Sequence, residues 1–215
     1  MLITLEGPDG SGKSSQIGPL AEFLSQQGYR VVTTREPGGT AISDQVRTIL
    51  ARMDNKAMYP RTETLLFCSA RAQLVDEVIR PALARGDIVL SDRYADSTLA
   101  YQGYGHGNDL NVLRQLLNFA TGSLWPDFTL LLDLEAEEGL KRRRTGGGEW
   151  NRLDDYELAF HQRVRQGYLE MAAREPERWQ VVNANAPLDV VQQALRQAVA
   201  QRLERLARPV NPDRG

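Results

Sequence analysis

Residues 2–14 read LITLEGPDGSGKS, an apolar run followed by an octet with glycine, glycine, lysine and serine in fixed places. The octet from Gly7 to Ser14 matches the P-loop pattern, in which glycines let the backbone curl so that successive N–H groups converge on phosphate oxygens. It follows a strand-like segment and opens a helical one, which is the context that a P-loop requires. A glycine-rich turn of purely structural value is the alternative, and this context disfavours it. The segment therefore predicts a site for a nucleoside triphosphate.

The loop also predicts how its side chains are used. Lys13 is expected to reach the β- and γ-phosphates, and Ser14 to bind magnesium. Asp9 is the unusual member, because a carboxylate aimed into a ring of phosphates would be repelled by roughly several kcal/mol. It should therefore point outward, toward an arginine, a metal-bound water or a sugar hydroxyl. The residues expected around the phosphates are Gly7, Pro8, Asp9, Gly10, Ser11, Gly12, Lys13, Ser14 and Ser15.

Short β-rich runs alternate with helical stretches along the chain. The runs cover residues 2–6, 30–34, 88–92, 128–133 and 179–182. Those at 88–92 and 128–133 contain continuously apolar triplets, which fits strands buried on both faces. The alternation predicts an α/β fold with a five-stranded parallel sheet, helices on both faces, and ligands at the carboxyl ends of the strands. Asp92 ends the third run and is the candidate second magnesium ligand, although many buried strands end in Asp.

Composition limits the class of protein. With 215 residues the chain suits one domain over residues 1–207, and the polar, proline-containing tail at 208–215 should be loose. A formal net charge of −2 gives no global attraction to nucleic acid or to an anionic membrane, so neither is an expected partner. Any affinity for phosphate must therefore be local.

Cysteine and histidine usage bears on compartment and metal. The single cysteine, Cys68, cannot form an internal disulfide, and the first residues lack the pattern of a signal peptide, so a cytoplasmic location is expected. His106 and His161 lie far apart in the sequence, which disfavours zinc or another transition metal. A hard, oxygen-bound ion such as magnesium remains compatible with the composition.

Arginines give the first indication of an acceptor. Arg93 directly follows Asp92, where its guanidinium could bind an acceptor phosphate, although an isolated arginine is about as often an ordinary surface ion pair. Residues 141–145 read KRRRT and lead into three glycines at 146–148. They fit a closing cationic lid over about residues 141–153 that neutralises the moving phosphoryl group and excludes water. On this stretch alone, a solvated basic helix end is the favoured alternative.

Four further segments complete the pattern: REPGGT at 35–40, LFCSAR at 66–71, DRY at 92–94 and STLAYQG at 97–103. With the P-loop they closely resemble bacterial thymidylate kinases, in order from Gly7 to about Leu195. The resemblance implies a P-loop nucleoside monophosphate kinase fold with a small lid. It also implies that ATP and Mg2+ are used to phosphorylate thymidine monophosphate (dTMP) to the diphosphate, for dTTP synthesis. The expected assembly is a homodimer paired through helices such as the one around residues 71–83.

By this resemblance Phe67 would stack on thymine and Arg71 would hydrogen-bond its carbonyl edge. Their spacing of four supports this, because positions i and i+4 share one helix face. Taken alone, Phe67 would more often be a core aromatic residue. Tyr101 matches a position that crowds out a ribose 2′-hydroxyl. The residues that the resemblance places at dTMP are Asp9, Arg35, Glu36, Pro37, Arg47, Phe67, Arg71, Arg93, Thr98, Tyr101 and Gln102.

The resemblance also reverses the interpretation of the basic segment. Thymidylate kinases with a glycine at the position of Gly10 carry their catalytic arginines in the lid. The candidates here are Arg142, Arg143, Arg144 and Arg152, of which Arg144 and Arg152 are expected to act on the transferred phosphoryl group. The predicted catalytic set is Lys13, Arg93, Asp9, Arg144 and Arg152. The loop of Asn183, Ala184, Asn185, Ala186 and Pro187 would contact the adenine, and ordinary asparagine turn chemistry is compatible with that role.

Three other classes stay open on the sequence. Another nucleotide or deoxynucleoside kinase would share the phosphate loop and differ in the acceptor. A nucleotide-dependent switch would usually carry an Asn-Lys-x-Asp base motif, and residues 55–58 lack its Asp. A nucleic-acid-stimulated ATPase is disfavoured by the negative net charge and the lack of a long basic run.

Overall fold

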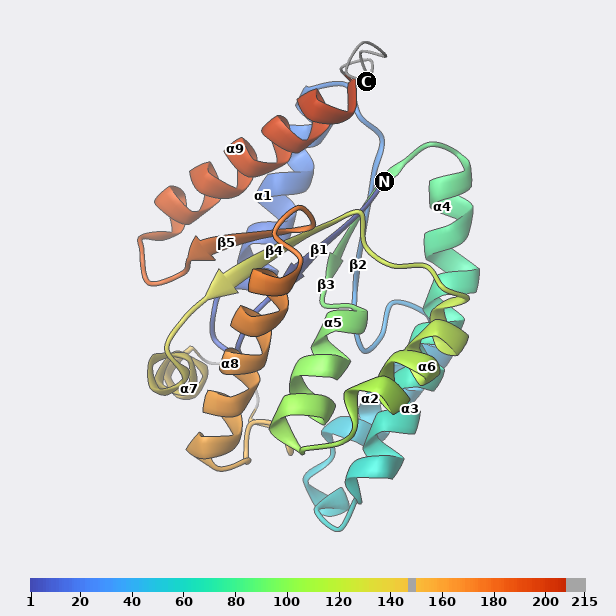
Figure 1. Cartoon of the computed structure of the whole chain (residues 1–215), viewed down its shortest axis with the longest axis vertical. Helices are drawn as coiled ribbons and strands as arrows, with labels where there is room; N and C mark the ends of the chain where they lie inside the picture. The colour runs from blue at the N-terminus through green and yellow to red at the C-terminus, as the bar shows by residue number, and fades with distance from the viewer. Residues whose placement is uncertain (147–149, 208–215) are drawn as a thin grey trace.

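Five parallel strands form the centre of the fold in the computed structural model, which describes residues 1–146 and 150–207 (Figure 1). The strand order is β2-β3-β1-β4-β5, and every neighbouring pair is parallel. The strands are β1 (Leu2–Glu6), β2 (Val31–Arg35), β3 (Ile88–Asp92), β4 (Phe128–Asp133) and β5 (Trp179–Asn183). The predicted five-stranded parallel sheet is confirmed. The second strand is shifted by one residue, and the fifth is one residue longer than predicted.

Helices cover both faces of this sheet. The described helices are α1 (Lys13–Gln26), α2 (Ala41–Ala51), α3 (Pro60–Leu74), α4 (Arg80–Ala84), α5 (Ala95–Thr98), α6 (Leu110–Thr121), α7 (Ala136–Thr145), α8 (Leu158–Arg174) and α9 (Leu188–Ala207). A short 3-10 helix η1 (Met53–Asn55) and two π-helical segments, η2 (Val75–Ile79) and η3 (Leu99–Gly105), join them. None of the described helices is long and apolar enough to cross a membrane.

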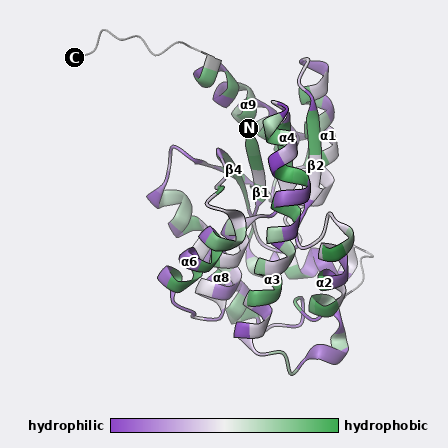
Figure 2. Cartoon of the chain, turned by 90° about the vertical axis from the view of Figure 1, so that its right-hand side faces the viewer, coloured by the Kyte–Doolittle hydropathy of each residue, from purple (hydrophilic) through white to green (hydrophobic). Residues whose placement is uncertain are grey.

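Two apolar clusters account for the layering. Alternate residues of a strand point to opposite faces, so Ile3 packs with Leu20 of α1 and Leu195 of α9, whereas Leu2 packs with residues of α3, α6 and α8. Both sheet faces are therefore buried, as the apolar runs predict. Figure 2 shows the same pattern, with hydrophobic strands inside helices whose colours alternate along the surface.

The structure describes most of the predicted lid but not the predicted loose tail. Residues 141–145 are the last residues of α7, and Arg152 is held against α2, its backbone N–H donating to the carbonyl of Ala51 at 3.2 Å. Residues 147–149, within the predicted lid, and the predicted loose tail at 208–215 lie outside the described residues.

Candidate active site

The P-loop leaves β1 at the centre of the sheet, between β3 and β4, and runs directly into α1. Gly7, Gly10 and Gly12 have φ values of 142°, 78° and 88°, a region that L-residues with side chains rarely adopt. A Cβ atom on Gly10 would overlap the backbone carbonyl of Gly139, so α7 packs directly on the loop. The glycine spacing read from the sequence is thus required by both the curl of the loop and its contact with α7.

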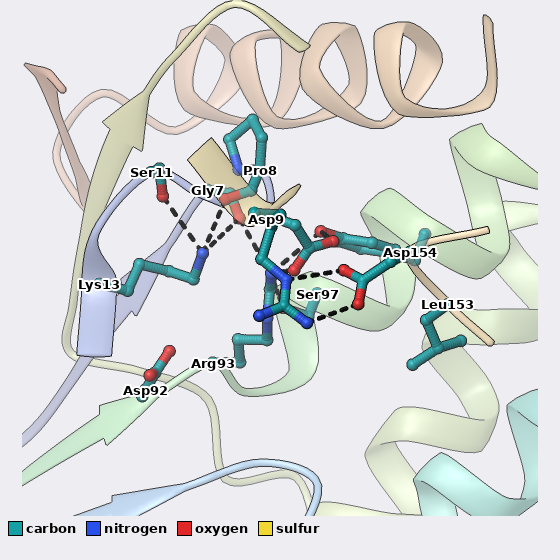
Figure 3. A network of polar contacts seen from close by, with 12 residues as sticks. Gly7, Pro8, Asp9, Ser11, Lys13, Asp92, Arg93, Ser97, Leu153 and Asp154 are labelled. Carbon is teal, nitrogen blue, oxygen red and sulfur yellow. Dashed lines mark hydrogen bonds and ion pairs between the residues drawn. The ribbon is translucent and has the colours of Figure 1, made fainter. Parts of the chain in front are cut away.

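Lys13 lies inside this curl and is 6% exposed. Its ammonium donates to the carbonyl oxygens of Gly7 and Pro8 at 3.0 and 2.8 Å and to the hydroxyl of Ser11 at 3.2 Å (Figure 3). Burial and the charge of Arg93 lower the pKa of Lys13 to about 8. The lysine therefore holds the loop in shape at the place where phosphates would enter.

Ser14 and Asp92 meet although 78 residues separate them in the chain. The hydroxyl of Ser14 donates to Oδ2 of Asp92 at 2.5 Å, beside the mouth of the loop. A hydroxyl and a carboxylate oxygen are hard donors of the kind that magnesium takes alongside substrate phosphates and water. Across the part of the chain that the structure describes, no group of three or more His, Cys, Asp and Glu side chains could hold a metal.

Asp9 turns away from the loop amides to an arginine, as the charge argument predicts. Its carboxylate accepts from Arg93 NH2 at 2.7 Å and from the Tyr101 hydroxyl at 2.7 Å (Figure 3 shows Asp9 and Arg93 facing each other). The Arg93 guanidinium also lies over the Tyr101 ring, 4.9 Å from its centre. Burial alone would raise the pKa of Asp9, but Arg93, Lys13 and the Tyr101 hydroxyl outweigh it and hold the pKa below the usual range. Asp9 is therefore an ionised counter-charge for Arg93.

One cavity of about 550 Å³ joins the loop to the predicted acceptor residues. Its lining includes Phe67, which is half-buried and belongs to neither apolar core cluster. The lining residues are Asp9, Gly10, Gly12, Lys13, Ser14, Ser15, Arg47, Phe67, Arg93, Ser97, Thr98, Tyr101, Gln102, Arg142, Arg143, Gly146, Asn151, Leu153 and Asp154. Five of these side chains are cationic and two are carboxylates, so the cavity is formally positive by three while the whole chain is negative by two. The charge that favours phosphate is local.

Arg71 lies behind the cavity wall rather than in it. It is 1% exposed, and its Nε donates to Glu36 Oε2 at 2.8 Å, NH1 to Thr98 Oγ1 at 2.9 Å and NH2 to the Tyr94 carbonyl at 3.0 Å. NH2 also lies 2.6 Å from Glu36 Oε2 as an ion pair. Hydrogen bonds within the described residues use one of the two NH1 hydrogens, which leaves the other on NH1. Burial raises the pKa of Glu36 against the lowering effect of Arg71. Glu36 therefore orients Arg71, and Arg71 supports Thr98 in the cavity wall.

Arg35 and Arg47 are placed differently. Arg47 lines the cavity and donates to the carbonyl of Pro37 at 2.9 Å. Arg35 is exposed, lies 3.5 Å from Asp44, and borders a separate hollow with Ser14 and Asp92. Of the two, the structure brings only Arg47 to the acceptor side.

The contact between α7 and the P-loop decides which of the basic side chains at 141–144 face the cavity. Gly139 touches the backbone of Asp9, and Arg143, four residues on, lies on the same helix face and lines the cavity. Arg143 pairs with Asp154 at 2.5 Å, whereas Arg144 is exposed and lies over the Trp150 ring at 5.2 Å. The structure thus places Arg143, and not Arg144, beside the loop.

Arg152 is also directed away from the cavity. Its side chain is 4% exposed, pairs with Glu63 at 2.5 Å and donates to the Leu50 carbonyl at 2.9 Å. The reason is the buried carboxylate of Glu63 on α3, which no sequence pattern around Arg152 predicts. The predicted catalytic residues Arg144 and Arg152 are therefore not brought to the cavity in this structure.

The predicted adenine loop lies next to α7. Arg142 donates to the carbonyl of Ala184 at 2.9 Å and to Asn185 Oδ1 at 3.1 Å. Asn183 Oδ1 accepts from the backbone N–H of Asn185 at 2.9 Å, which is asparagine turn chemistry. Both sequence-based interpretations of this loop are compatible with its position.

Several residues around the site were not identified from the sequence. Leu153 and Asp154 line the cavity, and Glu6, Ser97 and Tyr168 surround Arg93. Glu6 carried one signal, because a carboxylate ending an otherwise buried strand must find donors. Its partners lie 88 to 162 residues away, so the sequence could not name them.

The strand order, the P-loop, the adjacent hydroxyl–carboxylate pair and the basic helix over the loop define a P-loop nucleoside monophosphate kinase. Residues 5–195 match the sequence profile of the thymidylate kinase family. The chain belongs to the thymidylate kinase family, and the predicted resemblance is confirmed. It is accordingly an ATP-dependent phosphotransferase of nucleotide biosynthesis that converts dTMP to the diphosphate.

Individual relatives agree with this membership. The chain is 49% identical over 227 residues to a thymidylate kinase of Herpetosiphon aurantiacus, covering 94% of this chain and 96% of that one. It is 52% identical over 203 residues to one from Roseiflexus castenholzii, covering 89% of each. A crystal structure of thymidylate kinase from Ehrlichia chaffeensis matches with a TM-score of 0.74 and 33% identity, covering 93% of this chain and 98% of that chain.

Proposed function

We propose that residues 1–207 act as one kinase domain that binds MgATP in the P-loop and dTMP at the Phe67 end of the same cavity. The observation that carries this proposal is that Lys13, Ser14, Arg93 and Phe67 all line one cavity. Phosphoryl transfer requires that the two phosphates meet, and a continuous cavity lined by a guanidinium suits that meeting.

The donor side is built from Lys13, Ser14 and Asp92. In the proposed function, Lys13 exchanges its bonds to the loop carbonyls for bonds to the donor phosphates. Ser14 and Asp92 would hold magnesium, which when bound neutralises charge on the phosphate oxygens. Gly10 and the other loop residues supply backbone N–H donors.

Arg93 is assigned to the acceptor phosphate. Its pairing with Asp9 and its place over the Tyr101 ring fix the guanidinium before any nucleotide arrives. A fixed cation aimed at the transferring group stabilises developing charge without reorganisation. Asp9 keeps this orientation, and Tyr101 narrows the space beside the sugar.

The base would stack on Phe67, with Thr98 and Gln102 at its edge. Arg71 can offer its one remaining NH1 hydrogen to a base carbonyl while Glu36 holds it. Arg47, which donates to the carbonyl of Pro37, would complete the wall of the acceptor site. Arg35 reaches dTMP only if it leaves Asp44.

For the lid we assign Arg143 to the moving phosphoryl group and Arg142 to the junction with the adenine loop. A catalytic role for Arg144 or Arg152, as predicted from the sequence, requires a rearranged lid that frees Arg152 from Glu63. Both assignments give a cation that neutralises the moving group and closes the cavity to water.

The assembly that we propose is a cytoplasmic homodimer. Exposed apolar side chains on the adjacent helices α3 and α6 support it: Leu65 is 50%, Val112 53% and Phe119 90% exposed. Exposed apolar side chains on two adjacent helices are a surface that a subunit interface would cover. The free, buried Cys68 fits a reducing compartment. Sedimentation of the purified chain tests the dimer, and a monomer at micromolar concentration would contradict it.

Turnover of a panel of nucleoside monophosphates with MgATP tests the acceptor assignment. We expect dTMP to be preferred over deoxyuridine monophosphate by roughly 10- to 200-fold, because one methyl group in a pocket is worth about 1–3 kcal/mol. Purine monophosphates should be rejected by size. Equal turnover of all pyrimidine monophosphates would refute the placement of the base against Phe67.

A further inference from the structure

Glu6 is a fully buried carboxylate at the end of β1, one residue before the P-loop. Its Oε1 accepts from the backbone N–H of Tyr94 at 2.7 Å. Its Oε2 accepts from the hydroxyls of Ser97 and Tyr168 at 2.6 and 2.8 Å. All three donors belong to residues that surround Arg93.

The same two hydroxyls contact the side chain of Arg93. Its NH1 donates to Ser97 Oγ at 3.2 Å and to the Tyr168 hydroxyl at 3.1 Å. A hydroxyl has one hydrogen, so a hydroxyl that donates to Glu6 presents only lone pairs to its other neighbours. The two hydroxyls also lie 2.9 Å apart, where either could donate to the other. When both instead donate to Glu6, both accept from the guanidinium. The three groups form a chain from carboxylate through hydroxyl to Arg93.

The backbone of Arg93 is held at the same place. Its φ of 71° lies in the left-handed region, which is uncommon for a residue other than glycine. Such a conformation persists only where its surroundings fix it. The N–H of Arg93 donates to the Leu5 carbonyl at 3.0 Å, its carbonyl accepts from Ser91 Oγ at 2.7 Å, and the next N–H is the one bound by Glu6. One carboxylate therefore contacts both the backbone and the side-chain support of Arg93.

A negative charge is not needed for the backbone contact alone. Glutamine could accept the N–H of Tyr94 without the cost of burying a charge. Burial and the nearby Asp96 carboxylate raise the pKa of Glu6 to about 7, although the charge of Arg93 and the hydrogen bonds from the two hydroxyls act to lower it. The part of Glu6 that glutamine could not reproduce is an oxygen that accepts from both hydroxyls.

We propose that Glu6 is a positioning residue for phosphoryl transfer, which acts through Ser97 and Tyr168 to hold the Arg93 guanidinium toward the acceptor phosphate. This inference rests on the proposed role of Arg93 at that phosphate. Glu6 is not itself among the described residues that line the cavity, but its partner Ser97 is.

The test is a double-mutant cycle between Glu6→Gln and Arg93→Met. Glutamine keeps the size of the side chain and an acceptor for the N–H of Tyr94. Its amide NH2 group, however, would face the two hydroxyls that donate to Oε2 of Glu6 in the wild type, so donor would meet donor. We expect kcat/KM for dTMP to fall by about 10- to 100-fold in Glu6→Gln, because a misaligned catalytic group loses about this much. In the Arg93→Met background the same substitution should lower kcat/KM by less than about two-fold, because the guanidinium through which Glu6 acts is absent. Equal losses in both backgrounds, or no loss in the single variant, would overturn the proposal.

Matched variants separate positioning from folding. Thr4→Val removes another buried hydrogen bond of β1, the one to Thr129 at 3.0 Å, and should lower the melting temperature without changing kcat/KM. If Glu6→Gln does not fold, Tyr168→Phe and Ser97→Ala enter the same cycle and should show the same lack of additivity with Arg93→Met. An unchanged kcat/KM in Arg93→Met alone would refute the role of Arg93. A large loss there without coupling to Glu6, Ser97 or Tyr168 would refute the positioning alone.

Discussion

Glu63→Gln is expected to destabilise the fold by about 3 kcal/mol at neutral pH. Glu63 on α3 is 1% exposed and accepts hydrogen bonds from four side chains. Gln102 donates to it at 2.9 Å, Tyr156 at 2.7 Å and Arg152 at 2.5 Å, and His106 Nε2 lies at 3.1 Å. The carboxylate joins the segment after the lid to η3 and α3, so its loss affects all three.

The magnitude follows from the shift in the pKa of Glu63. Burial raises this pKa, but the hydrogen bonds from His106, Tyr156 and Gln102, together with the charge of Arg152, outweigh burial and bring it from 4.5 to about 2. At about 1.4 kcal/mol for each pH unit, the shift corresponds to about 3 kcal/mol. An independent route gives a similar value, because removing one partner of a buried ion pair costs about 3–5 kcal/mol.

The sign of the pH dependence is fixed by the direction of the shift. The folded-state pKa of Glu63 lies below the unfolded value, so its stabilisation is fully present above pH 4.5 and is lost as the pH falls toward 2. Urea unfolding of both proteins, followed by circular dichroism between pH 7 and pH 3, measures the difference. The gap should be widest above pH 5 and narrow in acid.

A matched exposed pair provides the control. Asp54 lies 2.7 Å from Arg52, but its side chain is 77% exposed, so Asp54→Asn should cost less than about 1 kcal/mol. A gap for Glu63→Gln that stays constant down to pH 3, or one below about 1 kcal/mol at pH 7, would refute the reasoning from the shifted pKa.

Three further variants probe the site. Phe67→Ala should raise KM for dTMP by roughly 10- to 100-fold, since stacking of a base is worth about 1–3 kcal/mol, while KM for ATP stays within about two-fold; equal changes in both would contradict the stacking. Gly28→Ala forces a side chain into positive φ, costing about 1–2 kcal/mol in unfolding experiments, and should leave kcat unchanged because its Cβ has no atom within 4 Å. Gly10→Ala should cost more and reduce kcat, because its Cβ would also overlap the carbonyl of Gly139. Arg143→Met should lower kcat at least about ten-fold more than Arg144→Met, and the opposite order would favour the assignment made from the sequence.

The sheet and the loop could be predicted because their signals are local. An apolar run of five residues predicts a strand wherever it falls, and the glycines of the P-loop encode its curl directly. The outward turn of Asp9 also followed from charge alone, since a carboxylate among phosphates is repelled. The position of its partner Arg93, directly after Asp92, indicates a phosphate-binding role on separate grounds.

The lid arginines show where such reasoning stops. Four consecutive basic residues, 141–144, look alike in the sequence, and only the contact of Gly139 with the P-loop fixes which helix face turns inward. A rotation of about 100° for each residue then separates Arg143 from Arg144. Arg152 is determined by Glu63, which is 89 residues away. No local pattern contains that information.

The arrangement of charge in the cavity explains how a chain with a negative net charge can bind two anionic nucleotides. Most of the cavity cations are already held: Lys13 by the loop carbonyls, Arg93 by Asp9 and Arg143 by Asp154. Each counter-charge weakens the attraction for phosphate, yet it also removes the entropy that a long side chain would lose on binding. Because Asp9 and Asp154 offset two of five cations, an excess of three remains, in fixed positions. Fixed cations stabilise a transition state more than free ones of equal number, since they need no reorganisation as the charge moves.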